Sequence, residues 1–432
     1  MTRHFLFFAV LCWIATHSAM AARVAVVLTD SKMDDKAGIA VALMKTDIKN
    51  PVKPQYDRVI LVFTGAEERS KMALAMSDYL NRAEKHQPAL PAGWETRTAW
   101  FQTKTNVLGQ AAPHESWYKN LRPTKELPVA TGESLAAEVA RVGRGSFVDV
   151  FQVAPCEDND VWDFINALPN INVYHIFFGY NSRQGIATDD MTRASRLALS
   201  QRQVQFHKTL QARLSDKHPS ARVIFTQNVP SFANAGAGSQ DLSWCRKYFP
   251  EEDILMALRD PFWTGLIILA NKYAEKATKL QQIPVSPEEF MTQVVSARLK
   301  ETTLRVQILK MLESAVSNQQ FAQDSPRSYS RVRDILVEEF TGKPAPTLEL
   351  GDANHMAIVL QYLDNETKDH NSYAMRLLPA LCDTSEENPT QPPRVSAGAP
   401  AAQSPDGWVL AGCDIQDTRG YIEGLFQENA LP

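Results

Sequence analysis

The sequence predicts an α/β protein with an open, mostly parallel sheet, helices on both faces and a helical C-terminal half. Two continuous apolar runs, residues 24–28 (VAVVL) and 58–63 (RVILVF), have the pattern of strands that are covered on both faces. Further such runs alternate with stretches of helical spacing. Strands that alternate with helices imply parallel pairing through right-handed crossovers.

The elements behind this prediction follow one another along the chain. Helices are expected from residue 37 and over 67–82, 132–142, 161–168 and 190–213, and further strands over 147–153, 173–178 and 221–226. Residues 87–128 hold several Pro and Trp residues with little periodicity, which indicates a long loop or insertion over the edge of the sheet. The pattern from about 252 to 340 is mostly helical. No internal repeat is evident.

Length, composition and charge limit which classes of protein this chain can belong to. With 432 residues and 44% hydrophobic content the chain can bury a large core, as one α/β domain or as two or three smaller ones. Charged residues make up 22% and the formal net charge is -4, so the electrostatic footprint of a nucleic-acid-binding protein is missing. A small-molecule partner is expected, and the oligomeric state stays open, a homo-oligomer included.

The N-terminus has the pattern of a secretory signal peptide. Arg3 and His4 precede a largely apolar stretch over 5–15, and Ala19 to Ala21 form a small-x-small cleavage site. The alternative, a membrane anchor, is disfavoured because the apolar run is shorter than the roughly 20 residues that a span needs. We therefore expect a signal peptide over 1–21, a mature chain from Ala22 that is secreted or periplasmic, and no membrane partner.

The C-terminal composition suggests a boundary. Residues 386–406 are rich in Pro, Ala, Ser and Gly, the composition of a flexible linker. The expected organisation is an α/β domain over 22–380 and a Pro/Ala-rich linker and tail over 381–432. Cys382 and Cys413 flank this segment in a compartment that permits disulfides, so we expect them to bond to each other.

Three carboxylates follow the first predicted strand. Asp30 comes directly after it, and Asp34 and Asp35 precede a predicted helix, at the sheet end where open α/β proteins bind ligands. Such carboxylates repel one another, and a hard cation with oxygen ligands, Ca²⁺ or Mg²⁺, would offset the repulsion. The plainer explanation is that Asp34 and Asp35 complement the helix dipole.

Three stretches in order carry a family resemblance: TDSKMDD at 29–35, VAPCEDND at 153–160 with LPNINVYHIFFGYN at 168–181, and LGDANHMAIVLQYLD at 350–364. Together they resemble the inosine-uridine-preferring nucleoside hydrolase family. The first motif of that family reads D-x-D-x-x-x-D-D, and its last three aspartates stand here as Asp30, Asp34 and Asp35. Leu28 replaces the first aspartate, and Lys32 replaces the family glycine.

The resemblance implies a nucleoside hydrolase-like fold and a role for each matching residue. Asp30 would be both a Ca²⁺ ligand and the base for the attacking water, and Asp34 would hold the ribose hydroxyls. Asp35 and Asp352 would complete the Ca²⁺ shell, with Glu157 where the family supplies a backbone carbonyl ligand. The implied activity is a secreted, metal-dependent hydrolase that cleaves the N-glycosidic bond of ribonucleosides, as in purine and pyrimidine salvage.

The departures from the family favour an alternative. Ala66 stands near the place of the ribose-binding asparagine, and Gly351 replaces the leaving-group histidine. Each polar contact that a pocket loses costs about 1 to 3 kcal/mol. The chain could therefore be a catalytically degenerate relative that acts as a binding or interaction module.

Several other residues have two explanations each. Asp260, before Pro261, is a rival to Asp352 for the late ligand, or else a helix N-cap. Asn181 follows a predicted strand and suits a substrate hydroxyl or a turn. His207 and His355 sit beside apolar runs, where a histidine is more often a packing residue than a catalyst. Four aromatic residues of the long insertion could stack on a base or pin that segment to the body: Trp94, Trp100, Trp117 and Tyr118.

Overall fold

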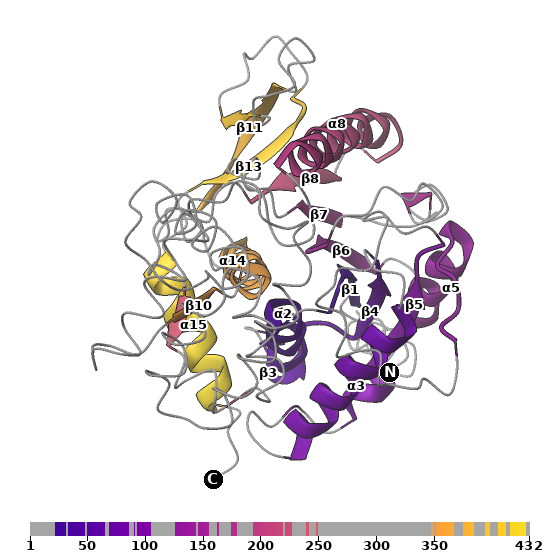
Figure 1. Cartoon of the computed structure of the whole chain (residues 1–432), viewed down its shortest axis with the longest axis vertical. Helices are drawn as coiled ribbons and strands as arrows, with labels where there is room; N and C mark the ends of the chain where they lie inside the picture. Colours follow the sequence, from indigo (N-terminus) through magenta and orange to yellow (C-terminus); the bar gives the residue numbers. More distant parts are fainter. Residues whose placement is uncertain are drawn as a thin grey trace, which may run out of the picture.

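The computed structural model describes most of the α/β core (Figure 1). Its description covers residues 22–31, 33–47, 50–64, 69–85, 90, 93–104, 126–143, 146–154, 162–163, 174–178, 193–218, 221–226, 239–241, 248, 347–349, 351–366, 375–383, 394–397, 405–411 and 415–428.

A nine-stranded sheet forms the centre of the molecule, in the order β12-β11-β13-β8-β7-β6-β1-β4-β5. Every neighbouring pair from β5 to β13 is parallel, and β11 is antiparallel to both of its neighbours. The predicted open, mostly parallel sheet is therefore confirmed. The strands are β1 (Arg23–Thr29), β4 (Arg58–Phe63), β5 (Thr98–Gln102), β6 (Phe147–Gln152), β7 (Tyr174–Phe178), β8 (Arg222–Phe225), β11 (Arg376–Asp383), β12 (Arg394–Ala397) and β13 (Gly407–Ala411).

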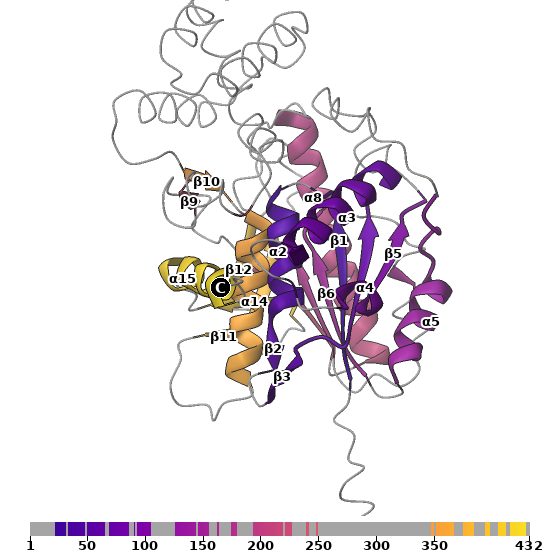
Figure 2. The same ribbon diagram turned by 90° about the horizontal axis from the view of Figure 1, so that it is seen from below.

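Helices cover both faces of this sheet (Figures 1 and 2). One face is covered by α2 (Met33–Met44), α3 (Arg69–Lys85) and α14 (Gly351–Glu366), with α15 (Ile415–Glu428) packed outside α14, and the other by α5 (Gly132–Val142) and α8 (Arg193–Lys217). The remaining described elements are α4 (Trp94–Arg97), the β2–β3 ladder (Thr46–Asp47 with Asn50–Pro54) and the β9–β10 ladder (Ser239–Asp241 with Thr347–Glu349).

Alternate residues of β1 belong to separate hydrophobic clusters. Val24, Val26 and Leu28 pack in the cluster that includes α5 and α8. Ala25 and Val27 pack in the cluster that includes α2, α3 and α14. Since all five are fully buried, β1 is a central strand covered on both faces, as its unbroken apolar run predicts.

The segment 87–128 is only partly the loop that its composition suggests. Within it lie α4 and β5, and β5 pairs in parallel with β4 as the edge strand of the sheet. Trp94 is 1% exposed, and the Trp100 ring stacks on Phe63 with centroids 5.6 Å apart. These two tryptophans pin the segment to the body, whereas Trp117 and Tyr118 lie outside the described residues.

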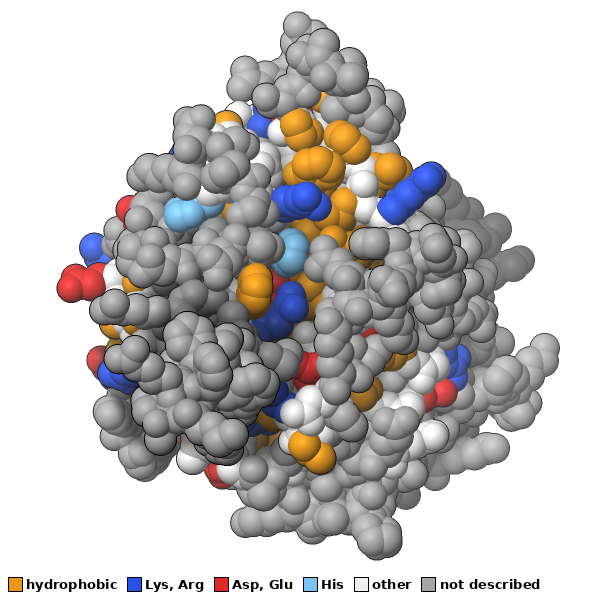
Figure 3. Space-filling model, turned by 180° about the vertical axis from the view of Figure 1, so that it is seen from behind, with side chains coloured by type: hydrophobic (Ala, Val, Ile, Leu, Met, Phe, Trp, Pro, Cys, Tyr) orange, Lys and Arg blue, Asp and Glu red, His pale blue; other side chains and the backbone are white. Residues whose placement is uncertain are grey.

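The C-terminal segment differs from the expected linker and tail. The boundary expected at 380 falls inside β11, and both β12 and β13 belong to the main sheet. Helix α15 packs on α14, with Ile422 and Phe426 fully buried. Hydrophobic side chains remain visible on the far face (Figure 3), and β11 keeps several apolar residues only half-buried. The mostly helical pattern over 252–340 lies outside the described residues.

The expected disulfide between Cys382 and Cys413 is wrong, because Cys382 is a free thiol. Strand register gives the reason: Ala411 pairs with Arg376, and Cys382 lies about 20 Å further along β11. Cys413 itself is outside the described residues, but two residues beyond Ala411 span at most about 7 Å. A disulfide requires Cα atoms within about 7 Å. Burial, with the nearby Asp406, raises the pKa of the Cys382 thiol to about 12.

No described helix combines the length and the apolar character that a membrane crossing requires.

Candidate functional site

The acidic turn between β1 and α2 is the core of the candidate site. Asp30 directly follows β1, and Asp34 and Asp35 lie in the first turn of α2. Asp30 is 7% exposed, Asp35 is fully buried and Asp34 is half-buried. The chain therefore gathers three carboxylates within one turn at the carboxyl end of a central parallel strand, where open α/β sheets bind ligands.

Local hydrogen bonds fix the geometry of this turn. The Thr29 hydroxyl donates to Asp35 Oδ1 at 2.5 Å, and the Asp30 amide donates to the same oxygen at 3.2 Å. The Ser31 amide donates to Thr29 Oγ1 at 3.0 Å, and Ser31 has φ 63°, in the left-handed region. A non-glycine residue held there stores strain, which is typical of functional sites. The Asp35 amide also bonds Asp34 Oδ1 at 3.3 Å.

Backbone hydrogen bonds join the neighbouring strand ends to this turn. The Thr64 amide, just after β4, donates to the Thr29 carbonyl at 2.9 Å. The amides of Val153 and Ala154, just after β6, both donate to the Leu28 carbonyl, at 3.1 and 3.0 Å. Thr64, Val153 and Ala154 therefore lie beside the end of β1, next to Asp30.

Helix α14 runs alongside α2 in the same direction (Figure 2). Near its start, His355 contacts Thr226, the residue after β8, at the carboxyl edge of the sheet. Further along, the Tyr362 ring lies 6.2 Å from that of His175, near the amino end of β7. The helix thus leads from the carboxyl edge toward the amino edge, as α2 does.

This direction locates Asp352. Lys45, which follows α2, forms an ion pair of 2.6 Å with Asp364 of α14, so the far ends of the two helices are level. Asp352 precedes Asp364 by nearly as many residues as Asp34 precedes Lys45. The first turn of α14, which contains Asp352, therefore lies beside the first turn of α2 at the carboxyl edge.

Three other expected site residues lie outside the part of the chain that the structure describes. They are Glu157, Asn181 and Asp260, the rival to Asp352. Among the residues that the structure describes, no three or more His, Cys, Asp or Glu side chains form a group that could hold a metal ion.

The turn nevertheless contains the residue type that a hard cation binds. Carboxylate oxygens are the ligands that Ca²⁺ prefers, and Asp30 and Asp35 present them on one turn. Two hydrogen bonds orient the Asp35 carboxylate, as outer-shell donors do for metal ligands. Leu28 fills the place of the first family aspartate with a side chain in the α5–α8 cluster, so that position offers no ligand.

Comparison with known proteins gives likeness in structure alone. No protein-family model and no curated protein matches the chain. A solved plant nucleoside hydrolase matches with a TM-score of 0.45 and 10% identity, over 95% of this chain and 99% of that chain. An inosine-guanosine nucleoside hydrolase matches with a TM-score of 0.45 and 9% identity, over 95% of this chain and 100% of that chain. For the inosine-uridine preferring nucleoside hydrolase of Bacillus anthracis they are 0.41 and 10%, over 94% and 99%.

These TM-scores lie below 0.5, so the assignment of a site rests on the residues and distances of this chain. Those residues include two buried histidines that the apolar patterns had suggested as packing residues.

His355 and His207 occupy opposite faces of the sheet. His355 Nδ1 lies 2.6 Å from Thr226 Oγ1, and the imidazole meets the Phe151 ring edge-on with centroids 6.4 Å apart. His207, on α8, has Nδ1 2.7 Å from the Gln203 carbonyl. Burial lowers the pKa of each to about 4, against a smaller opposing effect of the Phe177 and Gln203 backbone respectively. Both imidazoles are therefore neutral at pH 7.

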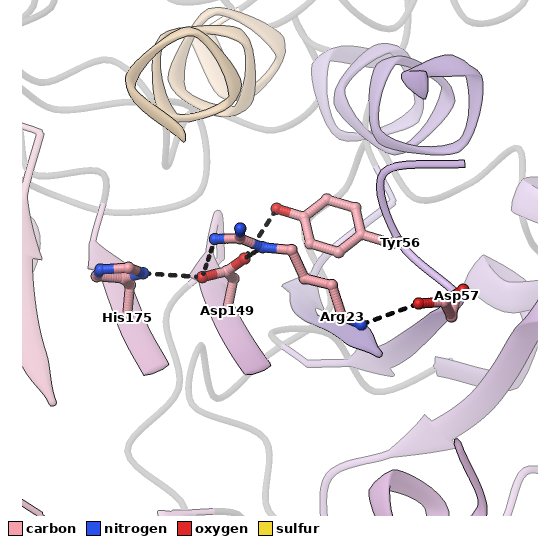
Figure 4. Close-up of polar contacts among 5 residues, drawn as sticks. All are labelled: Arg23, Tyr56, Asp57, Asp149 and His175. Carbon is pink, nitrogen blue, oxygen red and sulfur yellow. Dashed lines mark hydrogen bonds and ion pairs between the residues drawn. The ribbon is translucent and has the colours of Figure 1, made fainter. Parts of the chain in front are cut away.

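A second cluster of charged residues lies at the amino edge of the sheet, away from the acidic turn (Figure 4). Asp149 of β6 is fully buried and accepts hydrogen bonds from Arg23 Nε at 2.6 Å and Nη2 at 3.2 Å. The Tyr56 hydroxyl donates to it at 3.2 Å, and His175 Nδ1 lies 3.0 Å away. Because an ionised carboxylate only accepts, His175 carries a proton on Nδ1.

Burial and neighbouring charges both change the pKa values of this cluster. Burial alone would raise the pKa of Asp149, but Arg23 and His175 outweigh it and lower that pKa to about 2. Burial and the Asp149 charge raise the pKa of the Tyr56 hydroxyl well above its ordinary value. The sequence carried one signal of this cluster, the charged Asp149 inside the mostly apolar run 147–153. With every partner bonded, the cluster is a structural ion pair network.

Proposed function

We propose that the protein is a secreted, Ca²⁺-dependent hydrolase that cleaves the N-glycosidic bond of ribonucleosides to a free base and ribose. The observation that supports this most is the acidic turn at the carboxyl end of β1, whose three carboxylates match the family motif in spacing. The first turn of α14 lies beside that turn, which supports Asp352 as a fourth contributor.

Each residue has a role in this proposal. Asp30, Asp35 and Asp352 would hold Ca²⁺ with their carboxylates, and Glu157 would add its backbone carbonyl. Ca²⁺ held there supplies positive charge that lowers the pKa of an attacking water. Asp30 would accept the proton of that water. The carboxylates would also stabilise the positive charge that develops on the ribose as the bond to the base breaks.

Substrate recognition would fall to residues around the turn. Asp34, which is half-buried at the start of α2, would accept hydrogen bonds from the ribose hydroxyls. Asn181 would bind a further ribose hydroxyl from the segment after β7. The Thr29 hydroxyl would hold the Asp35 carboxylate in its orientation through the bond at 2.5 Å.

The test is release of free base by the mature protein, measured by chromatography over a panel of purine and pyrimidine ribonucleosides in the presence of Ca²⁺. The proposal expects release from at least one nucleoside, and its loss in Asp30→Ala. Asp78→Ala, which removes an exposed carboxylate on α3, is the matched control and should keep full activity. Absence of any free base across the panel, with bound calcium confirmed, would overturn the enzymatic proposal.

A second candidate function is a binding or interaction module that keeps the fold without catalysis. The observation that favours it is the side chain of Leu28, which is fully buried in the hydrophobic core where the family has an aspartate. Saturable binding of ribose or a nucleoside, without base release, would identify this case.

Secretion is part of the proposal and has its own measurement. The N-terminus of the exported protein should be Ala22, which N-terminal sequencing of the culture supernatant or periplasm would determine. An intact chain beginning at Met1, found only inside the cell, would contradict it.

A further inference from the structure

Arg222 has no counter-ion among the residues that the structure describes. It begins β8 at the amino edge of the sheet and is half-buried. Its guanidinium carbon lies 4.9 Å from the centroid of the Trp408 ring on β13. Such a stack orients a guanidinium but leaves its N–H donors available to an acceptor. A carboxylate that reached Arg222 would therefore add a charge-assisted hydrogen bond.

The carboxylates on either side of Arg222 already have partners. Asp406, just before β13, lies level with Arg222 in the parallel β8–β13 pair. Its oxygens accept from the Cys382 amide at 2.8 Å and from Lys208 of α8 at 3.3 Å. The Asp149 carboxylate, two strands away on β6, is bonded within the cluster of Figure 4. Arg222 therefore presents a positive charge on this face of the sheet.

Apolar side chains continue from this cation across β13 and β11. Alternate residues of β11, namely Leu377, Pro379 and Leu381, lie on the same face of the sheet as Trp408, and all four are half-buried. We call these four residues together with Arg222 the β11–β13 strip. Figure 3 shows hydrophobic side chains gathered on this side of the molecule, with Lys and Arg side chains at their border.

The β11–β13 strip has the dimensions of a short helix. Strands β8, β13 and β11 are neighbours, so the strip is two strand spacings wide, about 10 Å. The distance from Leu377 to Leu381 along β11 is about 14 Å, the length of about nine helical residues, and a helix with its side chains is roughly 10 Å across. Helices α2 and α14 cover the same face nearer its centre, which is how such sheets bury their apolar residues.

We propose that the β11–β13 strip docks an amphipathic helix of a partner protein. The apolar stripe of that helix covers Trp408 and the β11 side chains, and an Asp or Glu beside the stripe pairs with Arg222. Trp and Arg are the residue types that most often dominate the binding energy of protein interfaces. A second copy of the strip is a poorer occupant, because a two-fold contact brings two uncompensated Arg222 charges together.

This inference is independent of the proposed hydrolase activity. Arg222 begins β8 at the amino edge of the sheet, whereas Asp30 follows β1 at the carboxyl edge. The tests below therefore measure binding and not turnover.

The first experiment uses three fluorescein-labelled helical peptides. Their leucines are spaced three and four residues apart, and one residue beside that stripe is Glu, Gln or Lys. Fluorescence anisotropy measures their affinity for the mature protein. The wild type should bind the Glu peptide about tenfold more tightly than the Gln peptide, and the Lys peptide most weakly. Arg222→Glu should reverse this order.

Two further variants control this comparison. Arg222→Gln removes the charge without reversing it and should bind the Glu and Gln peptides equally, which keeps the test decisive if charge reversal unfolds the protein. Arg213→Glu is the matched control, because Arg213 lies on α8 across the sheet and pairs with Asp163 at the surface. It should keep the wild-type order. No saturable binding to the wild type, or an unchanged order in both Arg222 variants, would overturn the inference.

The second experiment distinguishes a partner helix from a second copy of this chain. Leu381→Glu places a charge inside the strip, so it should weaken the binding of the Glu peptide by about tenfold and leave the sedimentation velocity of the protein unchanged. A wild-type dimer that both Leu381→Glu and Arg222→Glu convert to monomers would assign the strip to a second copy and overturn the inference.

Discussion

Replacing Asp149 with asparagine is expected to lower the free energy of unfolding by about 3 kcal/mol at pH 7. The Asp149 carboxylate is fully buried, and Arg23, Tyr56 and His175 all bond it. Asparagine keeps the shape but removes the charge, which leaves the Arg23 guanidinium, with a side chain only 19% exposed, without its counter-ion.

The lowered pKa of Asp149 gives a second estimate, the pH-dependent part of the free energy of unfolding. It falls from an ordinary 3.8 in the unfolded chain to about 2 in the fold, which corresponds to about 2 kcal/mol of stabilisation. Because the folded value is the lower one, this stabilisation is complete above about pH 4 and is lost as the pH falls toward 2. The asparagine variant should lack this loss between pH 4 and pH 2.

Urea unfolding followed by circular dichroism measures both effects. Asp163→Asn is the matched control, because Asp163 pairs with Arg213 at 3.2 Å with about half of each side chain exposed. It should change the free energy of unfolding by less than about 1 kcal/mol. An Asp149→Asn variant within that limit of the wild type, or with the same slope between pH 4 and pH 2, would refute the reasoning.

Three further predictions concern other parts of the chain. The pKa of His355 and of His207 is about 4 in the folded protein and 6.5 in the unfolded chain. Because the unfolded chain binds the proton more tightly, each histidine should lower the free energy of unfolding by about 3 kcal/mol as the pH falls from 6.5 to 4. Urea unfolding over that pH range measures this, and a free energy that does not change with pH would contradict it. Ser31 has φ 63°, so Ser31→Gly should be about 1 kcal/mol more stable to urea than Ser31→Ala, and equal stability would argue against strain there. Thr29→Val should lower calcium affinity by about tenfold in calorimetry through loss of the bond to Asp35, while Thr29→Ser keeps it; unchanged affinity in the valine variant contradicts the orienting role.

A fourth prediction follows from the strand register. Cys382 should stay unmodified by thiol reagents in the native protein and react only after unfolding, since it is buried with a pKa raised to about 12. Non-reducing peptide mapping that recovered Cys382 joined to Cys413 would contradict this.

The sequence was most informative where hydrophobic pattern alone decides structure. The apolar runs at 24–28 and 58–63 predicted central parallel strands, and both are fully buried in the sheet. The acidic turn was also predictable, because a buried strand followed by a helix fixes which end of the sheet Asp30 and Asp35 occupy.

Composition was a poorer guide at the two edges of the sheet. Residues 98–102 are strand β5 within a Pro- and Trp-containing stretch, and β12 and β13 fall in or near a stretch read as a linker. An edge strand needs an apolar pattern on fewer positions than a central one, and its pairing depends on a distant partner. Local composition therefore does not reveal an edge strand. The expected Cys382–Cys413 disulfide was wrong for the same reason, because it was inferred from the composition of the segment between the two cysteines.

The charged cluster around Asp149 shows a different limit. A single Asp in an apolar strand indicates a buried partner, but the partners come from β1, β7 and the segment before β4. Only the sheet order brings Arg23, Tyr56 and His175 to one point. The same holds for His355, whose neighbours follow from the direction of α14 and not from its own sequence.

The most direct test of the central claim is a calcium titration by calorimetry on the mature protein and on Asp30→Asn and Asp352→Asn. If β1, α2 and α14 together build a metal site at the sheet's carboxyl edge, the wild type binds one Ca²⁺ per chain and both variants lose it, while Asp78→Asn binds as the wild type does. A wild type that takes up no calcium, or an Asp352→Asn variant that binds it unchanged, would contradict the account.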